Sequence, residues 1–175
     1  MKSKFFRFLS FAVVVAFLMP AMTNAQTGKT NFAGNWAFNQ SKSDMGQPPQ
    51  GGGQGGGMRM GGNFTAKQEA NLLTVERTRT GQDGTTTTTT EKYTLDGKEC
   101  VNTNPRGESK STVTWSADGK TLTIVTTRTM NMNGESMQMK STAIWTLTDA
   151  NTLTVNTTST TPNGDRVTKM VYDKK

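Results

Sequence analysis

Three arginines offer the clearest chemistry in this sequence, because their spacing places them beside apolar residues. Arg77, Arg79 and Arg128 each stand in a stretch that alternates between apolar and polar residues. Alternate residues of a β-strand share one face, so the guanidinium groups are predicted on the same face as the apolar side chains. A buried guanidinium group needs a carboxylate, water or an anionic ligand. These arginines therefore indicate either an anion-binding site or a hydrated polar end of the buried face.

Methionine is the second unusual feature, because it occurs in three Met-x-Met pairs. The pairs are Met58 and Met60, Met130 and Met132, and Met137 and Met139. Thioether sulfurs are soft ligands that suit Cu(I), particularly where histidine is lacking. They also form a pliable apolar lining for a ligand, or simply fill space. We favour lining or filling over a metal site, because a methionine cluster alone is a weak metal signal.

Enzymatic chemistry finds little support. The chain contains no histidine, so the usual general base, triad member and metal ligand is missing. It also lacks a phosphate-binding loop, a nucleophile elbow and a pair of acidic residues suited to catalysis. Glu91 is the one carboxylate predicted to face inward, and we expect it to form an ion pair with Arg77. The sequence therefore predicts a protein that is not an enzyme and has no cofactor.

The stretches that carry these residues follow one template. Residues 71–80, 120–129 and 151–160 each begin after a turn signal and alternate with period two, as a half-buried strand does. Their equivalent inward positions are Leu73, Leu122 and Leu153, then Val75, Ile124 and Val155, then Arg77, Thr126 and Thr157. Each copy thus begins apolar and becomes polar along the same face. Strands of this kind, curled together, would enclose a space that is apolar at one end and polar at the other.

Turn sequences predict how the strands pair. The connections are Asp96–Gly97, Asp118–Gly119, Asn133–Gly134, Asp149–Asn151 and Asn163–Gly164. The first places Tyr93 beside Cys100, and the next three pair Trp115 with Leu122, Leu122 with Trp145, and Trp145 with Val155. The last pairs Val155 with Tyr172. All of these registers turn the large apolar side chains to one face, and a slip by one residue would expose them.

The predicted fold is all-β. Counting a first strand at residues 31–39 gives about ten strands in an antiparallel up-and-down meander. So long an open sheet would curl, and we expect a closed barrel, with a two-layer β-sandwich as the alternative. The interior of the barrel would then form a cup with a deep apolar wall. The residues of that wall are Trp115, Trp145, Leu122, Leu153 and Tyr172.

The two ends of the chain and its composition set further expectations. Residues 1–25 have the basic start, apolar run and small-residue site of a signal peptide cleaved after Ala25, which predicts a secreted or periplasmic product. A single domain would span 26–175, with a flexible Gly/Pro-rich loop at 45–62 between the first two strands. Cys100 is the only cysteine, and we expect no lipid anchor and no membrane span. The net charge of +7 falls to +4 once residues 1–25 and their three cations are removed, which is too mild and scattered to indicate nucleic acid, and a monomer is expected.

The opening strand carries a family resemblance. Residues Phe32 to Phe38, with the pattern Phe-x-Gly-x-Trp, resemble the first strand of the calycin superfamily, the lipocalins and fatty-acid-binding proteins, and the chain is similar to bacterial lipocalin-like secreted proteins. The resemblance implies a barrel in which Trp36 closes the narrow end. Two features depart from the pattern of fatty-acid-binding proteins. A Gly-rich segment replaces their helical lid, and Arg166 and Tyr172 are too far apart to form their Arg-x-Tyr pair.

Together these observations predict an exported, non-enzymatic protein that binds a small hydrophobic or amphipathic molecule, with the possibility that the ligand is anionic. Arg79 and Arg128 would contact it near the mouth of the cup. Two other functions stay open. One is a Cu(I)-binding protein that uses the methionine pairs, and the other is a structural or protein-interaction domain with a packed interior.

Overall fold

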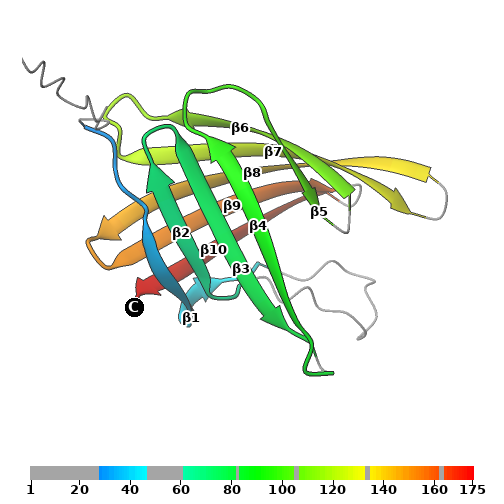
Figure 1. The fold of residues 1–175 in the computed structure, drawn as a ribbon, viewed down its shortest axis with the longest axis horizontal. Helices are drawn as coiled ribbons and strands as arrows, with labels where there is room; N and C mark the ends of the chain where they lie inside the picture. Colours follow the sequence, from blue (N-terminus) through cyan, green and yellow to red (C-terminus); the bar gives the residue numbers. More distant parts are fainter. Residues whose placement is uncertain (1–27, 47–60, 82, 105–106, 133–134, 162–163) are drawn as a thin grey trace, which may run out of the picture.

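The computed structural model describes residues 28–46, 61–81, 83–104, 107–132, 135–161 and 164–175. The expected signal peptide, most of the Gly/Pro-rich loop, Met58 and Met60 lie outside these ranges. Within them, no helix has the length and hydropathy needed to cross a membrane. The chain folds into ten strands (Figure 1): β1 (Gly34–Asp44), β2 (Phe64–Glu69), β3 (Leu72–Thr80), β4 (Thr86–Thr94), β5 (Cys100–Asn104), β6 (Gly107–Trp115), β7 (Thr121–Met132), β8 (Glu135–Asp149), β9 (Thr152–Thr161) and β10 (Gly164–Lys174).

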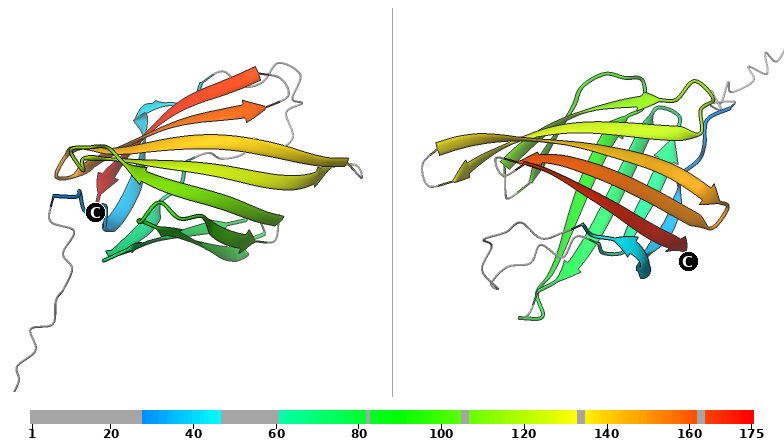
Figure 2. Two further views of the ribbon diagram at one scale, coloured as in Figure 1. Left: turned by 90° about the horizontal axis from the view of Figure 1, so that it is seen from above. Right: turned by 180° about the vertical axis from the view of Figure 1, so that it is seen from behind.

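All ten strands belong to one antiparallel sheet. Their order is β4-β3-β2-β1-β10-β9-β8-β7-β6-β5, so the first and last strands of the chain pair with each other. The sheet curls until strands β2–β4 lie across strands β7–β9 (Figure 2). The result is a nearly closed barrel, as the sequence predicts, and not a two-layer sandwich.

Three predicted hairpin registers are confirmed. The observed pairs are Trp115 with Leu122, Leu122 with Trp145, and Trp145 with Val155. The inward face of each strand therefore carries the apolar residues that the alternation assigns to it. Burial of that face drives the register, since a one-residue slip would transfer every large apolar side chain to water.

The register predicted for the last hairpin is wrong by two residues. An Asn163–Gly164 turn would place Val155 opposite Tyr172, but Val155 pairs with Met170. The reason is that Gly164 already belongs to β10 and pairs with Thr161. Its φ of +104° is a conformation that glycine adopts readily. Because the shift is even, the same side chains still face inward.

The barrel stays unsealed between β4 and β5, where no strand ladder forms. The predicted pairing of Tyr93 with Cys100 is therefore wrong. After β4 the chain stays attached to the β2–β3 turn, because the Leu95 amide donates to the Asn71 carbonyl at 2.9 Å. Among the described residues, the Asn102 side chain bridges the two edges instead. Asn102 accepts from the Lys92 amide at 2.8 Å and donates to the Lys92 carbonyl at 2.9 Å.

The apolar core fills one end of the barrel. The first inward positions of the repeated template, Leu73, Leu122 and Leu153, are fully buried. Trp36 lies in this core, and its indole nitrogen donates to the Phe32 carbonyl at 2.9 Å. Further along the same faces, the burial of the template declines, as its polar positions lead us to expect. The core thus leaves the opposite end of the barrel for polar residues.

Candidate ligand-binding cavity

Beyond the apolar core the barrel interior contains a cavity of about 280 Å³, here called the inner cavity. Its apolar lining comes mainly from Tyr93, Ile124, Trp145, Val155, Met170 and Tyr172, on strands β4 and β7–β10. Thr126, Ser141, Thr157 and Ser159 add hydroxyl groups toward the polar end. This volume lies near the lower limit of common small-molecule pockets, which are apolar with a few placed polar groups.

A second space, here called the outer cavity, has a volume of about 600 Å³. Its own lining residues are Arg79, Thr80, Gly81, Asp83, Thr85, Thr87 and Thr89, on or between strands β3 and β4. Most of these residues are exposed. Alternate threonines of the run at residues 85–90 therefore contribute hydroxyl groups to a polar mouth.

Three charged residues line both cavities: Arg77, Glu91 and Arg128. We call them the charged waist. Arg77 is on β3, Glu91 on β4 and Arg128 on β7, so the curl of the sheet brings them together. Two arginines against one carboxylate leave the waist with an excess of one positive charge.

The ion pair within the waist differs from the predicted one. Glu91 pairs with Arg128, whose Nη2 atom lies 3.9 Å from the Glu91 Oε1 atom, and not with Arg77. Arg77 is directed elsewhere, because its guanidinium carbon lies 4.9 Å from the centre of the Phe64 ring. Phe64 faces Arg77 across the β2–β3 ladder, which explains this cation–π contact.

Two guanidinium nitrogens of the waist are buried without a partner. Arg77 Nη1 and Arg128 Nε have no hydrogen-bond acceptor among the described residues. A buried donor that lacks an acceptor costs free energy, and more so when it belongs to a charged group. A ligand anion could accept from either of them only after the guanidinium group turns toward a cavity.

The tyrosines beside the waist stay neutral. Burial raises the pKa of Tyr93, the Glu91 carboxylate raises it further, and Arg77 opposes the rise. Burial also raises the pKa of Tyr172, whose hydroxyl donates to the Met170 sulfur at 3.4 Å. The two tyrosines therefore add no charge to the inner cavity.

Several residues predicted to bind a ligand do line these spaces. Trp145, Tyr172 and Met139 line the inner cavity, Arg79 lines the outer cavity, and Arg128 lines both. Arg77 lines both as well. The alternation that places Arg77 inward also places Tyr93 and Met170 inward, but it does not show that they border open space.

Other predicted residues lie elsewhere. Leu122 and Leu153 are fully buried in the core and do not border the inner cavity. Trp115 is half-buried and stacks on Phe32, with 5.9 Å between the ring centres. Trp36 is part of the same packed end, and its role in closing the barrel stays a prediction.

The methionine pairs are only partly described. Met130 pairs with Met137 in the β7–β8 ladder, and Met139 pairs with Arg128. The side chains of Met130 and Met132, like all of Met58 and Met60, lie outside the described part of the chain. No cluster of histidine, cysteine or acidic residues suited to a metal occurs in the part that is described. The Cu(I) site thus stays a prediction.

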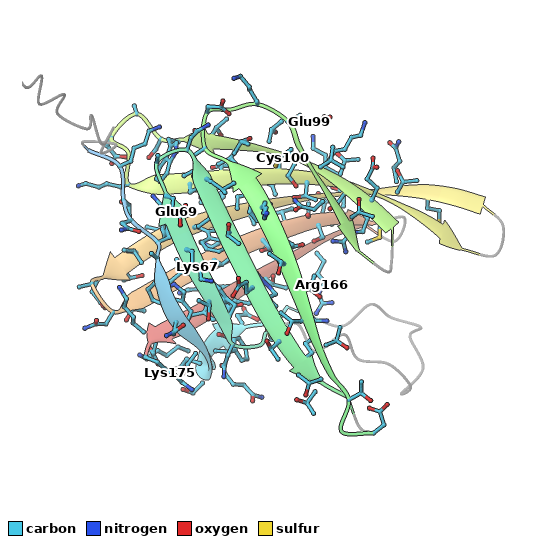
Figure 3. All side chains as sticks on the ribbon, in the orientation of Figure 1. Lys67, Glu69, Glu99, Cys100, Arg166 and Lys175 are labelled. Carbon is cyan, nitrogen blue, oxygen red and sulfur yellow. The ribbon has the colours of Figure 1, made fainter. Side chains whose placement is uncertain are left out.

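Arg166 is engaged outside both cavities. This β10 residue, labelled in Figure 3, donates from Nη2 to the Met45 carbonyl at 2.9 Å. It therefore anchors the segment that follows β1.

Comparison with known proteins supports the fold but leaves the family open. No protein-family model matches the chain, and no curated protein matches it significantly in sequence. Among solved structures, the zebrafish ileal bile acid-binding protein in complex with cholic acid is similar, with a TM-score of 0.54 and 16% sequence identity. The match covers 82% of this chain and 98% of the zebrafish chain. At this identity the likeness concerns the calycin-like barrel alone.

Proposed function

We propose that this protein is an exported, non-catalytic binding protein for a small amphipathic anion. The apolar part of the ligand occupies the inner cavity, and its negative charge lies at the charged waist. The observation that carries the proposal is the charged waist, where two guanidinium groups and one carboxylate lie at the boundary between an apolar and a polar space. Arg77 Nη1 and Arg128 Nε also lack an acceptor among the described residues, and hydrogen bonds from charged donors to anions are stronger than those between neutral groups.

Two further observations support the proposal. The barrel is similar to a protein whose structure holds cholic acid, which is itself an amphipathic carboxylate. The absence of histidine argues against catalysis at the waist, and the signal-like residues 1–25 support export. A cavity of about 280 Å³ also favours a ligand carrier over a domain with a packed interior.

The test compares a charged and an uncharged ligand of equal chain length. Dodecanoate and dodecanol are titrated into the protein by calorimetry, below the concentrations at which they aggregate. Arg128→Met should weaken dodecanoate binding about 10- to 100-fold, because a hydrogen bond to a charged group contributes about 1.5–3 kcal/mol. Dodecanol binding should stay unchanged, since the methionine keeps an apolar side chain at the cavity wall.

Lys169→Met is the matched control. Lys169 is exposed on β10 and borders neither cavity, so this variant removes the same charge without touching the waist. If dodecanoate fails to bind the wild type, or if both variants weaken it equally, the proposed function is wrong.

A further inference from the structure

The waist lies between two cavities of different chemistry, and this position constrains the ligand beyond its charge. We propose that the ligand carries one negative charge in its interior, as a phosphodiester does, with an apolar chain on one side and a hydroxyl-bearing group on the other. This proposal rests on the proposed function and names the class of ligand. Its basis is the order in which apolar residues, charged residues and threonines follow one another along the barrel.

The first step concerns where the two ends of a bound molecule lie. An apolar chain fits below the waist, where Tyr93, Trp145 and Val155 surround it. A ligand with a terminal carboxylate would end at the waist and leave the outer cavity of about 600 Å³ to water. A ligand that continues past its charge would use that space as well.

The second step is the chemistry of the outer cavity. Thr80, Thr85, Thr87 and Thr89 supply hydroxyl groups that both donate and accept hydrogen bonds. Arg79 and Asp83 add one charge of each sign, so the outer cavity has no net charge of its own. Such a lining suits a neutral, hydroxylated group such as glycerol and gives little support to a second charge.

The third step is the charge count at the waist. Arg77 and Arg128 against Glu91 leave one positive charge, which a monoanion neutralises and a dianion exceeds. Lys140 also borders the inner cavity, but it is exposed and solvent screens its charge. The waist is therefore matched to a single negative charge.

The fourth step is that the anion does not need to displace Glu91. Glu91 contacts Nη2 of Arg128, whereas the unpartnered donor of that residue is Nε. The second unpartnered donor, Arg77 Nη1, is on a different strand. A phosphodiester at the waist can pair with Arg77, which has no carboxylate partner among the described residues, while the Glu91–Arg128 ion pair persists.

The experiment measures the affinities of four ligands with the same twelve-carbon chain, below the concentrations at which they aggregate. They are lauroyl-lysophosphatidylglycerol, dodecanoate, dodecyl phosphate at about pH 8, where it is mostly dianionic, and monolauroylglycerol. The lysophosphatidylglycerol, a monoanionic diester with a terminal glycerol, should bind about tenfold more tightly than each of the others. That factor corresponds to one to two additional hydrogen bonds.

Two variants separate the parts of the argument. Thr87→Val with Thr89→Val removes hydroxyl groups from the outer cavity, and it should reduce the advantage of lysophosphatidylglycerol over dodecanoate to less than about threefold. Thr90→Val, at an outward position of β4 that borders neither cavity, should keep that advantage. Glu91→Gln gives the waist two positive charges and should reverse the order of lysophosphatidylglycerol and dodecyl phosphate.

The outcomes distinguish this proposal from the proposed function. If dodecanoate binds as tightly as lysophosphatidylglycerol, and both depend on Arg128, the internal charge is overturned while the carrier of amphipathic anions stands. If the Thr87 and Thr89 substitutions leave the advantage intact, the role of the outer cavity is also overturned. If none of the three anions binds better than monolauroylglycerol, both proposals fail.

Discussion

The Asn102 side chain should contribute measurably to stability, because among the described residues it is the one that joins the β4 and β5 edges by hydrogen bonds, both of them to the Lys92 backbone. Asn102 is buried on β5, and its amide mimics a strand partner for Lys92 on β4. Asn102→Leu keeps a similar volume but removes both the donor and the acceptor. The β4 edge would then keep its ion pair to Arg128 on β7, but among the described residues no hydrogen bond would join it to β5.

The magnitude follows from the two bonds. Each hydrogen bond contributes about 0.5–1.5 kcal/mol, and Lys92 is exposed enough for water to replace part of the loss. We therefore expect Asn102→Leu to lower the free energy of unfolding by about 2 kcal/mol. For a chain of this length that loss lowers the melting temperature by about 4–8 °C. Asn102→Asp keeps the acceptor for the Lys92 amide but loses the donor, so it should lie between the two proteins in stability.

Urea denaturation followed by tryptophan fluorescence measures these differences. Asn156→Leu is the control, because Asn156 is exposed on β9 and substitutions of this kind usually change stability by less than about 0.5 kcal/mol. A loss below about 0.5 kcal/mol in Asn102→Leu would refute the reasoning. It would mean that the β4–β5 edges are held by packing and do not depend on the amide.

Two further predictions concern backbone and pH. In urea denaturation, Gly119→Ala should lower the free energy of unfolding by about 1–3 kcal/mol more than Gly84→Ala does. Both glycines have positive φ, but only at Gly119 would the new methyl group meet the Gly28 carbonyl. Equal losses in the two variants would contradict that contact. Burial raises the pKa of Tyr93 and Tyr172, the only tyrosines of the sequence, so the folded protein favours their neutral hydroxyls. The stabilisation from burying these neutral groups is complete below about pH 10 and is lost as the pH rises further, because the unfolded chain then releases the protons. Ultraviolet absorbance should show tyrosinate only as the protein unfolds, and a reversible titration near pH 10 in the folded protein would contradict this prediction.

The sequence predicts the faces of the strands better than it predicts their registers. Alternation and short turns act locally, and the burial of one face penalises every odd slip. An even slip escapes that penalty, which explains why the β9–β10 register is predicted wrongly while Tyr172 still faces inward. The Asn102 bridge is beyond such reasoning, because no ladder joins β5 to β4, the strand that carries its partner Lys92.

The location of the charged waist could be anticipated, but its pairing could not. The template predicts where each strand changes from apolar to polar, and Arg77 stands at that change. It does not predict that Glu91 on β4 reaches Arg128 on β7, because that contact depends on the curl of the sheet. A prediction from neighbouring strands alone therefore selects the wrong ion pair.

This distinction has a consequence for specificity. The core that stabilises the barrel uses Leu73, Leu122 and Leu153, whereas in the carrier that we propose the charge facing a ligand comes from the three waist residues. Glu91→Gln should then change the preferred ligand charge, because it removes the one carboxylate of the waist without altering the packed end. On this proposal, stability and ligand choice depend on different rows of inward-facing residues. A barrel built in this way can acquire a new ligand by exchanging one row, provided that every buried charge in that row keeps a partner.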